Sequence, residues 1–491
     1  MDLLIDGSLG AGTLALVALG LLFALGFEFA NGFHDTANAV ATVIYTHTLP
    51  PTAAVIWSGL WNFIGVLVSS GAVAFGIVNL LPADLVAGAG SGASFAMVFA
   101  LLGSAILWNV GTWYLGLPAS SSHTLIGSII GVGMTHSLVA GEGLSEGVNW
   151  SKLGETMTAL LVSPVIGFAA AGLLLLLARL VFRNPTLHRP ASETKSPPLA
   201  VRAVLIATCT GVSFTHGSND GQKGMGLIML VLIALAPAAF ALQLDMPPAH
   251  LRAIVEGSRQ VEHILHVPGA PALDAATAEQ RLDHYADTGR YNADVLPALA
   301  MKNDAIVATL SRIASLRDLT AAERSQLRSD VYLVDVSVDH LMRSNTVGDA
   351  DAAALDEYRD TLLPLAQYLP LWVKAAVALA LGLGTMIGWR RIVTTIGEKI
   401  GKSGLSYAQG ATAELVTMTT IGFAGVIGVP VSTTHTLTSS VAGTMFANRS
   451  GLQGDTVRNI LIAWVLTVPA CVLLGSLLFA GSLFVVLRLF G

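Results

Sequence analysis

The chain has 491 residues, of which 53% are hydrophobic and only 12% are charged. Soluble globular domains carry about twice that charged fraction, so the composition predicts a membrane protein. The formal net charge of −6 identifies no partner, and the lack of a basic stripe with interleaved aromatic residues argues against nucleic acid.

A membrane-spanning helix needs about 20 mostly apolar residues. Ten apolar segments are candidates, in chain order 11–30, 52–80, 93–115, 124–140, 154–182, 201–243, 370–389, 405–427, 434–448 and 457–489. A straight helix over 201–243 would run about 60 Å, and the polar run His216–Gly221 interrupts it. We therefore expect this segment to be broken, tilted or re-entrant. The predicted fold is an all-α polytopic membrane protein with about 10–12 transmembrane helices.

Two basic loops orient the predicted spans. The stretch 179–202 holds five Lys or Arg against Glu193, and the loop 390–402 holds four against Glu398. Short loops rich in Lys and Arg stay in the cytoplasm. Since five predicted spans precede the first loop and five follow it, both termini are expected outside. The two halves would then form inverted-topology repeats, as in many secondary transporters.

The predicted domains follow from these spans and from one polar insert. They are a first transmembrane repeat (1–183), a basic cytoplasmic linker (184–200), the start of a second repeat (201–243), the insert (244–369) and the remainder of the second repeat (370–491). Apolar residues recur with helical spacing in parts of the insert, such as Val331–Leu341. We expect a small helical domain on the extracytoplasmic side, which either regulates the protein or covers its mouth.

Two short polar motifs each occur twice within apolar sequence. The first is Gly32–Ala39 and again Gly217–Gly224, and the second is Gly116–Thr124 and again Gly428–Thr436. Paired segments interrupted by Gly or Pro, in corresponding positions of two halves, indicate the binding site of a transporter built from repeats. We expect the four breaks to create discontinuous helices and to converge near the membrane midplane.

The second motif carries hydroxyl groups after a Gly-x-Pro break. These residues are Ser120, Ser121, Ser122, Ser432, Thr433 and Thr434. Ser and Thr are preferred N-caps, and a helix N-terminus attracts anions. Two such ends that face each other would suit a compact tetrahedral oxyanion. The alternative is that the hydroxyls only satisfy backbone groups at helix kinks. His123 and His435 follow at matching positions and are read as core or site-lining residues, not metal ligands.

The first motif carries intramembrane charges. Asp35 and Asp220 are functional-site candidates by default, although they could instead only cap helices. A carboxylate beside an anion site needs a compensating cation or proton, which predicts cation- or proton-coupled anion binding. Asn38 lies one helical turn after Asp35, and Lys223 takes the corresponding place after Asp220. We hypothesise that the Lys223 ammonium replaces a bound cation. The alternative is a lysine that snorkels to the interface.

Two further acidic residues lie in apolar surroundings. Glu28 and Glu414 are candidates to carry a coupled proton, and the sequence does not rank them. His34 and His216 are weaker candidates for proton handling.

Catalytic signatures are missing from the sequence. It contains no nucleophile elbow, P-loop, dinucleotide fingerprint or metal-ligand spacing. We therefore expect no enzyme activity, no cofactor and no assigned metal site. An ion gradient, rather than ATP hydrolysis within this chain, would supply the energy.

Four stretches in order resemble the inorganic phosphate transporter (PiT) family, in particular its bacterial low-affinity members. They are Asn31–Thr42, Gly116–Gly127, His216–Gly224 and Pro430–His435, and Arg390–Lys399 also resembles the family's loop. The resemblance covers nearly the whole chain except the insert. It implies symport of inorganic phosphate with Na⁺ or H⁺. By the same resemblance, the Ser/Thr motifs would bind phosphate, while Asp35, Asn38, Asn219 and Asp220 would handle the cation and help to fix the substrate.

The chain departs from the family pattern at three positions. His34 stands where the family often has Asn, Lys223 replaces the second-half Asn, and Asn62 stands where many members carry Glu. These departures resemble bacterial members that use protons and accept phosphate as a neutral complex with a divalent cation. We therefore expect a proton-coupled phosphate symporter in a bacterial inner membrane. The alternatives are sodium coupling or another oxyanion such as sulfate. No subunit interface can be read from the sequence, so a homodimer stays a hypothesis.

Overall fold

The computed structural model describes residues 10–78, 80, 92–141, 143, 144, 147–191, 196–266, 269, 273–344 and 346–490. Within these ranges the chain is helical, with two isolated β-bridges and no β-strand. Residues 192–195, which include Glu193 and Lys195 of the predicted basic linker, lie outside the described residues. The predicted all-α fold is confirmed.

Helices occur in every one of the ten predicted apolar segments. The first half contains α2 (Ala11–Asp35), α3 (Ala37–Tyr45), α4 (Pro51–Val68), α5 (Ala72–Val78), α7 (Gly92–Tyr114), α8 (Ser121–Ala140) and α9 (Trp150–Val181). The second half contains α10 (Leu199–Leu235), α17 (Leu371–Met386), α18 (Arg390–Thr394), the π-helix η4 (Thr395–Lys399), α19 (Tyr407–Val426), α20 (Thr433–Ala447) and α21 (Gly454–Phe490).

Seven described segments are long and apolar enough to cross a membrane. They are Ala11–Tyr45, Pro51–Val68, Ser94–Tyr114, Ser121–Ala140, Trp150–Val181, Leu199–Leu235 and Gly454–Val486. The bent pair Leu371–Met386 and Arg390–Lys399, with a 56° angle, would make eight. These counts are below the predicted ten to twelve, partly because α20 has only 15 residues. The protein is a multi-pass membrane protein.

The two copies of the first motif fold differently. In the first half, α2 ends at Asp35 and α3 starts at Ala37. In the second half, α10 is one continuous helix of 37 residues, so a break near His216–Gly221 is wrong, and a tilted helix is the alternative that this length leaves. In the middle of α10 the side chains of His216, Asp220 and Lys223 are buried and contact other helices, and no proline interrupts the backbone hydrogen bonds of this helix. A polar run alone therefore does not end this helix.

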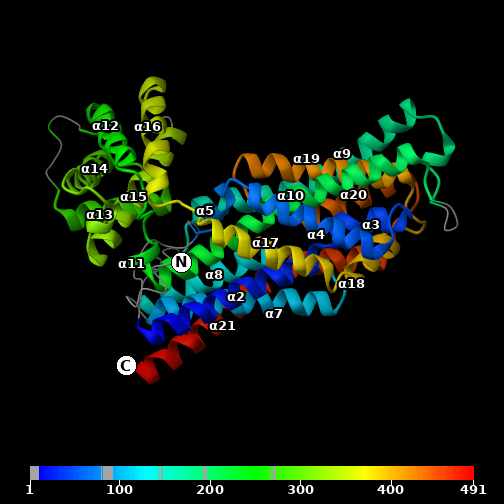
Figure 1. The fold of residues 1–491 in the computed structure, drawn as a ribbon, viewed down its shortest axis with the longest axis horizontal. Coiled ribbons are helices and arrows are strands. Elements are labelled where there is room, and N and C mark those ends of the chain that lie inside the picture. Colours follow the sequence, from blue (N-terminus) through cyan, green and yellow to red (C-terminus); the bar gives the residue numbers. More distant parts are fainter. Residues whose placement is uncertain are drawn as a thin grey trace.

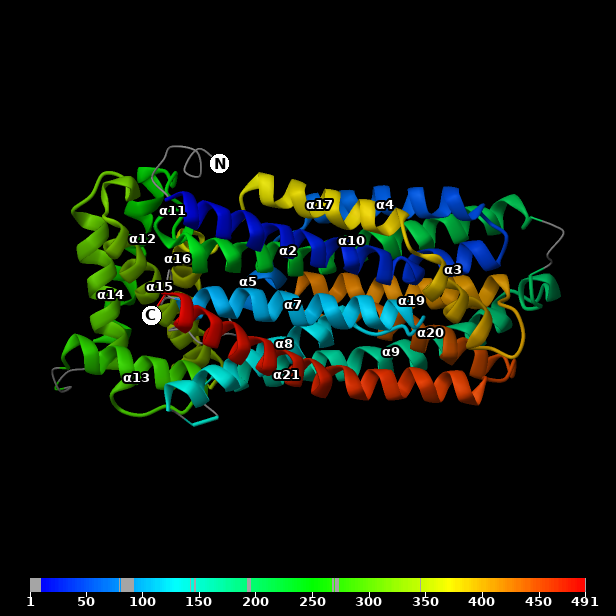
Figure 2. The same cartoon turned by 90° about the horizontal axis from the view of Figure 1, so that it is seen from below.

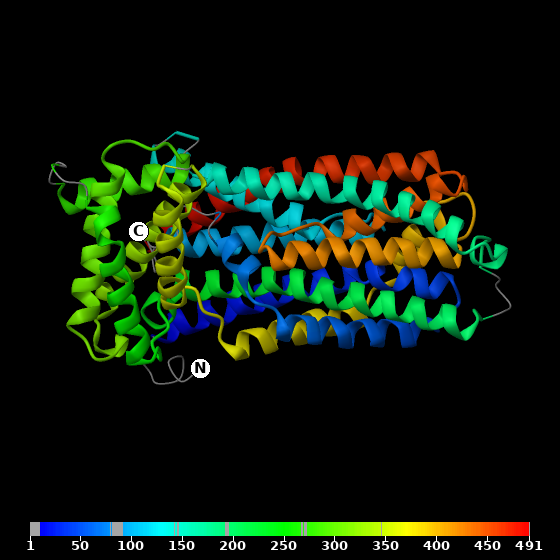
Figure 3. The same cartoon turned by 90° about the horizontal axis from the view of Figure 1, so that it is seen from above.

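Corresponding helices of the two halves run in opposite directions. Figure 2 shows that α2 and α9 run away from one end of the molecule, whereas α10 and α21 run toward it. Their packing is reciprocal, since α8 packs on α21 while α20 packs on α9, and α2 packs on α17 while α10 packs on α4. Figure 3 shows the opposite face, on which α9 (teal), α19 (orange) and α10 (green) lie side by side.

A matched pair of glycines permits two of these close crossings. A Cβ on Gly131 of α8 would lie 2.2 Å from the Val472 carbonyl oxygen of α21. A Cβ on Gly443 of α20 would lie 2.1 Å from the Phe168 carbonyl oxygen of α9. Both glycines occupy the same position relative to the second motif, so the halves share a packing detail as well as motifs.

The insert forms a separate helical layer at one end of the membrane helices (Figure 1). It contains α12 (Pro248–Leu265), α13 (Ala275–Thr288), α14 (Val295–Ser311), α15 (Ala321–Arg343) and α16 (Asp349–Leu362), and the short α11 (Pro237–Phe240) leads into it. These helices enclose their own hydrophobic core. The predicted amphipathic face lies on α15, where Val331, Val334, Val338 and Leu341 are buried.

The insert lies next to the start of α2 and the end of α21, whereas the basic 390–402 loop lies at the opposite end (Figure 1). The chain enters and leaves the insert at neighbouring points, because Arg328 donates to the carbonyl oxygens of Ala241 (2.9 Å) and Ala366 (3.2 Å). The insert also contacts α9 through an ion pair between Arg343 and Glu155. The insert is thus connected through the chain to α10 and α17, and a salt bridge holds it to α9.

Candidate functional site

The breaks before α8 and α20 present their N-termini to the protein interior. The side chain of Ser120 accepts a hydrogen bond from the His123 backbone N–H (3.2 Å), and Ser432 accepts one from the His435 backbone N–H (3.1 Å). Both serines therefore cap their helices. The hydroxyl of Ser122 donates to the Val431 carbonyl oxygen (2.9 Å), so the two helix starts adjoin each other.

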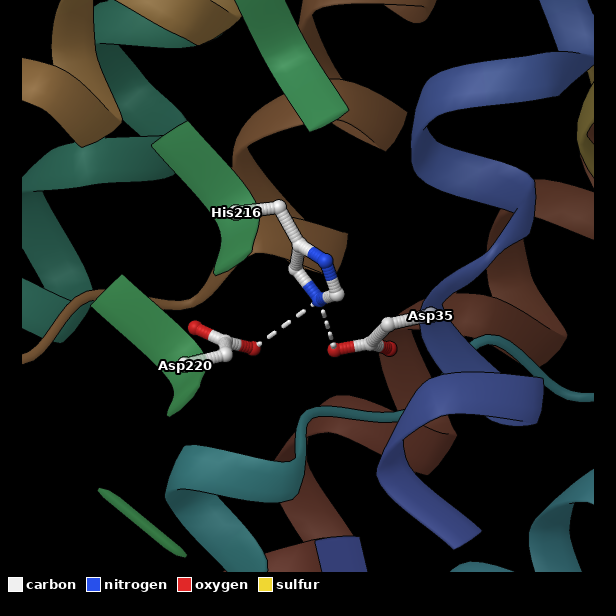
Figure 4. A group of neighbouring side chains, drawn as sticks. All are labelled: Asp35, His216 and Asp220. Atoms are coloured by element: carbon white, nitrogen blue, oxygen red, sulfur yellow. Dashed lines mark ion pairs between the residues drawn. The ribbon is translucent and has the colours of Figure 1, made fainter. Parts of the chain in front are cut away.

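Two aspartates from the repeated first motif face each other across a histidine (Figure 4). Nε2 of His216 lies 3.3 Å from Oδ2 of Asp220 and 3.8 Å from Oδ2 of Asp35. Asp35 ends α2, and the other two residues lie one turn apart on α10. All three side chains are buried. The predicted convergence of the two copies of this motif is therefore present in the structure.

Asn62 of α4 orients the His216 ring. Its Nδ2 donates to the Thr385 hydroxyl (3.0 Å), which leaves its Oδ1 facing Nδ1 of His216 at 2.9 Å. With Nδ1 held in this way, Nε2 points between the two carboxylates. The one-turn spacing of His216 and Asp220 in the sequence could have predicted their contact. Nothing in the sequence indicated that Asn62 would contact His216.

Asp35, His216 and Asp220 could together ligate a metal ion. One ligand atom of each lies within 4.8 Å of the others. Two carboxylates and an imidazole suit several divalent metals. Sequence spacing assigned no metal site, because Asp35 lies far from the other two along the chain.

The start of α20 contacts both aspartates through hydroxyl groups. The Thr433 hydroxyl lies 3.1 Å from Oδ2 of Asp35 and 3.3 Å from Oδ2 of Asp220. The Thr434 hydroxyl donates to Oδ1 of Asp35 at 2.5 Å and accepts from Nδ2 of Asn38 at 3.1 Å. The second-half hydroxyl motif thus meets the first-half acidic motif directly.

Lys223 completes the cluster from α10. Its ammonium donates to Oδ1 of Asp220 (2.5 Å), to the Ser122 hydroxyl (2.6 Å) and to the Val431 carbonyl oxygen (3.2 Å). Its side chain is 0% exposed, so the alternative of a lysine that snorkels to the interface does not hold.

Other predicted residues lie beside this cluster or apart from it. Ser121 is buried at the start of α8, and Nδ2 of Asn219 donates to the Val429 carbonyl oxygen at 3.4 Å. Glu28 is buried against Gly224, and neither of its carboxyl oxygens has a hydrogen-bond partner among the described residues. Glu414 accepts hydrogen bonds from Thr42 and Thr208. The two candidate proton carriers are therefore in different surroundings.

The matched histidines also meet. The rings of His123 and His435 lie 4.5 Å apart, and His435 stacks on Trp464 at 3.9 Å. Since Nδ1 of His123 lies 2.9 Å from the capping hydroxyl of Ser120, this stack supports both helix starts.

Comparison with known proteins identifies the family of this chain. The model of the phosphate transporter family matches residues 31–475. The low-affinity inorganic phosphate transporter PitA of Escherichia coli strain K12 is 42% identical over 485 residues, which cover 95% of this chain and 97% of that protein. PitB of the same strain is 41% identical over 480 residues, which cover 94% and 95%.

A solved structure described as the sodium-dependent phosphate transporter is similar to this one with a TM-score of 0.53. The match covers 97% of this chain and all of that chain at 17% identity, which supports the fold alone. The family match and the two relatives span nearly the whole sequence, and on that ground the chain belongs to the phosphate transporter family.

Proposed function

We propose that this protein is a secondary transporter that imports inorganic phosphate together with protons across a bacterial inner membrane. One observation carries the proposal: the hydroxyl-bearing start of α20 contacts two buried aspartates from opposite halves of the chain, and the start of α8 contacts Lys223, which pairs with one of them. The names of the Escherichia coli relatives support phosphate as the substrate.

The helix starts supply donors for a phosphate ion. The first N–H groups of a helix have no partner within it, and here they belong to Ser121 and Ser122 in α8 and to Thr433 and Thr434 in α20. Their side-chain hydroxyls add further donors. Because Ser120 and Ser432 already cap these helices, we assign them to shaping the helix starts, while the other four would contact phosphate.

Proton coupling follows from competition for the same hydroxyls. Thr433 and Thr434 now donate to Asp35. A phosphate that takes these donors would leave the buried Asp35 carboxylate with only His34 Nδ1 at 3.2 Å and His216 Nε2 at 3.8 Å beside it, and a buried charge that loses hydrogen bonds is costly. A proton or cation that arrives with phosphate would remove this penalty. We assign coupling to the neighbourhood of Asp35, Asn38 and Asp220, with Glu28 and Glu414 as further proton carriers.

Alternating access would come from relative motion of two helix groups. The aspartates belong to α2 and α10, which pack with α4 and α17, whereas the hydroxyls belong to α8 and α20, which pack with α21 and α9. The reciprocal packing supports inverted repeats, and the site residues are buried from both sides. Motion at the boundary between the groups would expose the site to one side and then to the other.

A neutral complex of phosphate with a divalent cation is a second form of the substrate. The grouping of Asp35, His216 and Asp220 favours it, because these residues could ligate the metal of such a complex. Phosphate uptake that rises with added magnesium at constant pH would support this form. Equal uptake with magnesium and with a chelator would remove it.

Uptake of radiolabelled phosphate into proteoliposomes tests the proposed site. Thr433→Val and Thr434→Val remove only hydroxyls that contact Asp35, so each should strongly reduce uptake. Thr438→Val is the matched control on the same helix, since its hydroxyl has no hydrogen-bond partner among the described residues. Excess arsenate should compete with phosphate and sulfate should not. Normal uptake by both site variants, or a preference for sulfate, would contradict the proposal.

A further inference from the structure

We infer that Lys223 is a built-in cation that occupies a cation-binding position of the site and thereby determines which coupling ion the protein requires. The inference deepens the proposed transport function and rests on it. It concerns a single ammonium group and the three oxygens that surround it.

The surroundings of the Lys223 ammonium resemble the ligand set of a hard metal cation. Its Nζ contacts a carboxylate oxygen of Asp220, a hydroxyl oxygen of Ser122 and a backbone carbonyl oxygen of Val431, at 2.5, 2.6 and 3.2 Å. Carboxylate and carbonyl oxygens are what hard cations take from proteins. The three oxygens come from α10, from α8 and from the break before α20.

These contacts use all the hydrogen-bonding capacity of the ammonium group. A lysine ammonium has three donors and no acceptor, and here each donor has an oxygen partner. The side chains of Lys223 and Asp220 are both 0% exposed. A buried charge is tolerated only when it is paired and hydrogen-bonded, and this one is. A metal cation cannot enter the same position while the ammonium fills it.

The corresponding position in the first half has different chemistry. Asn38 lies three residues after Asp35, as Lys223 lies three residues after Asp220. Its Nδ2 donates to Thr434, but its Oδ1 has no hydrogen-bond partner among the described residues. The first half therefore presents a neutral side chain with an unused acceptor oxygen, where the second half presents a fixed positive charge. An ion that binds during transport would bind on the Asp35 side.

The position of Lys223 also gives it a role toward the substrate. Its ammonium contacts Ser122, one of the residues assigned to phosphate, and it links the two helix groups, because its partners Asp220 and Ser122 lie on α10 and α8. A fixed charge there would attract phosphate without a bound metal cation. The protein would then need no sodium at this position, in contrast to a relative of known structure that is described as sodium-dependent.

The test replaces the ammonium with a neutral side chain that can ligate a cation. Lys223→Gln is purified, and its melting temperature is measured in sodium chloride and in choline chloride at equal ionic strength. Sodium that fills the vacated position should raise the melting temperature of the variant by about 2 °C or more relative to choline. The wild-type protein should melt at the same temperature in both salts.

Two further variants keep the inference falsifiable if Lys223→Gln is unstable in choline. Asp220→Asn combined with Lys223→Gln removes the carboxylate ligand, so its melting temperature should not respond to sodium. Lys302→Gln is the matched control, because Lys302 is another buried lysine paired with a carboxylate, Asp330, but lies in the insert. It should lose stability equally in both salts.

The same proteins are then assayed for phosphate uptake with and without sodium. Uptake by Lys223→Gln should rise with sodium, while wild-type uptake should not change. A variant that shows no response to sodium in either assay, or a wild-type protein that sodium stabilises, would overturn the inference. A wild-type protein that transports no phosphate would instead overturn the proposed function, and the melting data would still report on Lys223.

Discussion

Replacing Asp220 by Asn should separate the structural role of the cluster from its transport role. Asp220 pairs with Lys223 at 2.5 Å, and neither side chain is exposed. Removing one partner of a buried ion pair costs about 3–5 kcal/mol, because the remaining charge is uncompensated. The Ser122 hydroxyl and the Val431 carbonyl oxygen still solvate the ammonium, so the lower end of that range is expected.

A compensating substitution recovers the stability. Combining Asp220→Asn with Lys223→Met removes both charges, and apolar replacement of a whole buried pair is often neutral or stabilising. The double variant should therefore melt closer to the wild-type protein than Asp220→Asn alone. Neither variant should accumulate phosphate in proteoliposomes, since both lack one of the two carboxylates that flank His216 in the proposed site.

The insert offers a matched control for this experiment. Asp330→Asn also removes a buried carboxylate from a lysine, but Lys302 keeps a second partner, Glu279, at 2.7 Å. It should lower the melting temperature less than Asp220→Asn and leave uptake unchanged. Full uptake by well-expressed Asp220→Asn, or a melting temperature equal to that of the wild-type protein, would refute the reasoning.

Three other predictions concern helix packing, the proton and the insert. Gly131→Ala and Gly443→Ala each place a Cβ too close to a backbone carbonyl oxygen of the neighbouring helix, at nearly the same distance in the two halves. Each should cost about 1–3 kcal/mol, whereas Gly111→Ala, with no atom within 4 Å of its Cβ, should not lower the melting temperature. Glu414→Gln keeps an acceptor oxygen for one of the two threonine hydroxyls, and the other hydroxyl can rotate to accept from the new amide N–H. Folding should therefore survive while proton-driven accumulation falls; unchanged accumulation would remove Glu414 as a proton carrier. Glu155→Gln breaks the exposed ion pair between Glu155 of α9 and Arg343 of the insert, so the free energy of unfolding should change by less than about 1 kcal/mol. If this ion pair resists the motion of α9, the rate of phosphate uptake should rise. An unchanged uptake rate would show that the ion pair does not resist that motion.

Much of the site could be predicted because its residues are repeated. The sequence indicated Asp35, Asp220 and the two hydroxyl motifs as site residues, because each motif occurs in both halves within apolar sequence. A polar group in a membrane needs partners, so repeated polar groups were expected to converge. The structure brings Thr433 and Thr434 to Asp35 as that reasoning required.

The different roles of the hydroxyl groups within each motif could not be predicted. Ser120 and Ser122 are two residues apart and chemically identical, yet the first caps α8 and the second binds Lys223. The role of each hydroxyl depends on the residue at which the helix starts, and the exact start of a helix is the part of it that a sequence predicts least well.

The continuity of α10 was missed for a related reason. The run His216–Gly221 resembles a break when its polarity alone is considered, but Asp35 and Asn62 supply partners from other helices. Those partners lie far away in the sequence, and satisfied polar groups do not interrupt backbone hydrogen bonds. The continuity of α10 therefore depends on tertiary contacts, which local composition does not show.

Proteoliposome uptake under imposed gradients tests the central claim most directly. Radiolabelled phosphate is offered with an inward proton gradient and no sodium, then with a sodium gradient at equal pH on both sides. Coupling to protons predicts accumulation above equilibrium in the first condition and none in the second. Accumulation only with the sodium gradient would contradict proton coupling and the role of Lys223, and uptake that never exceeds equilibrium would contradict active transport itself.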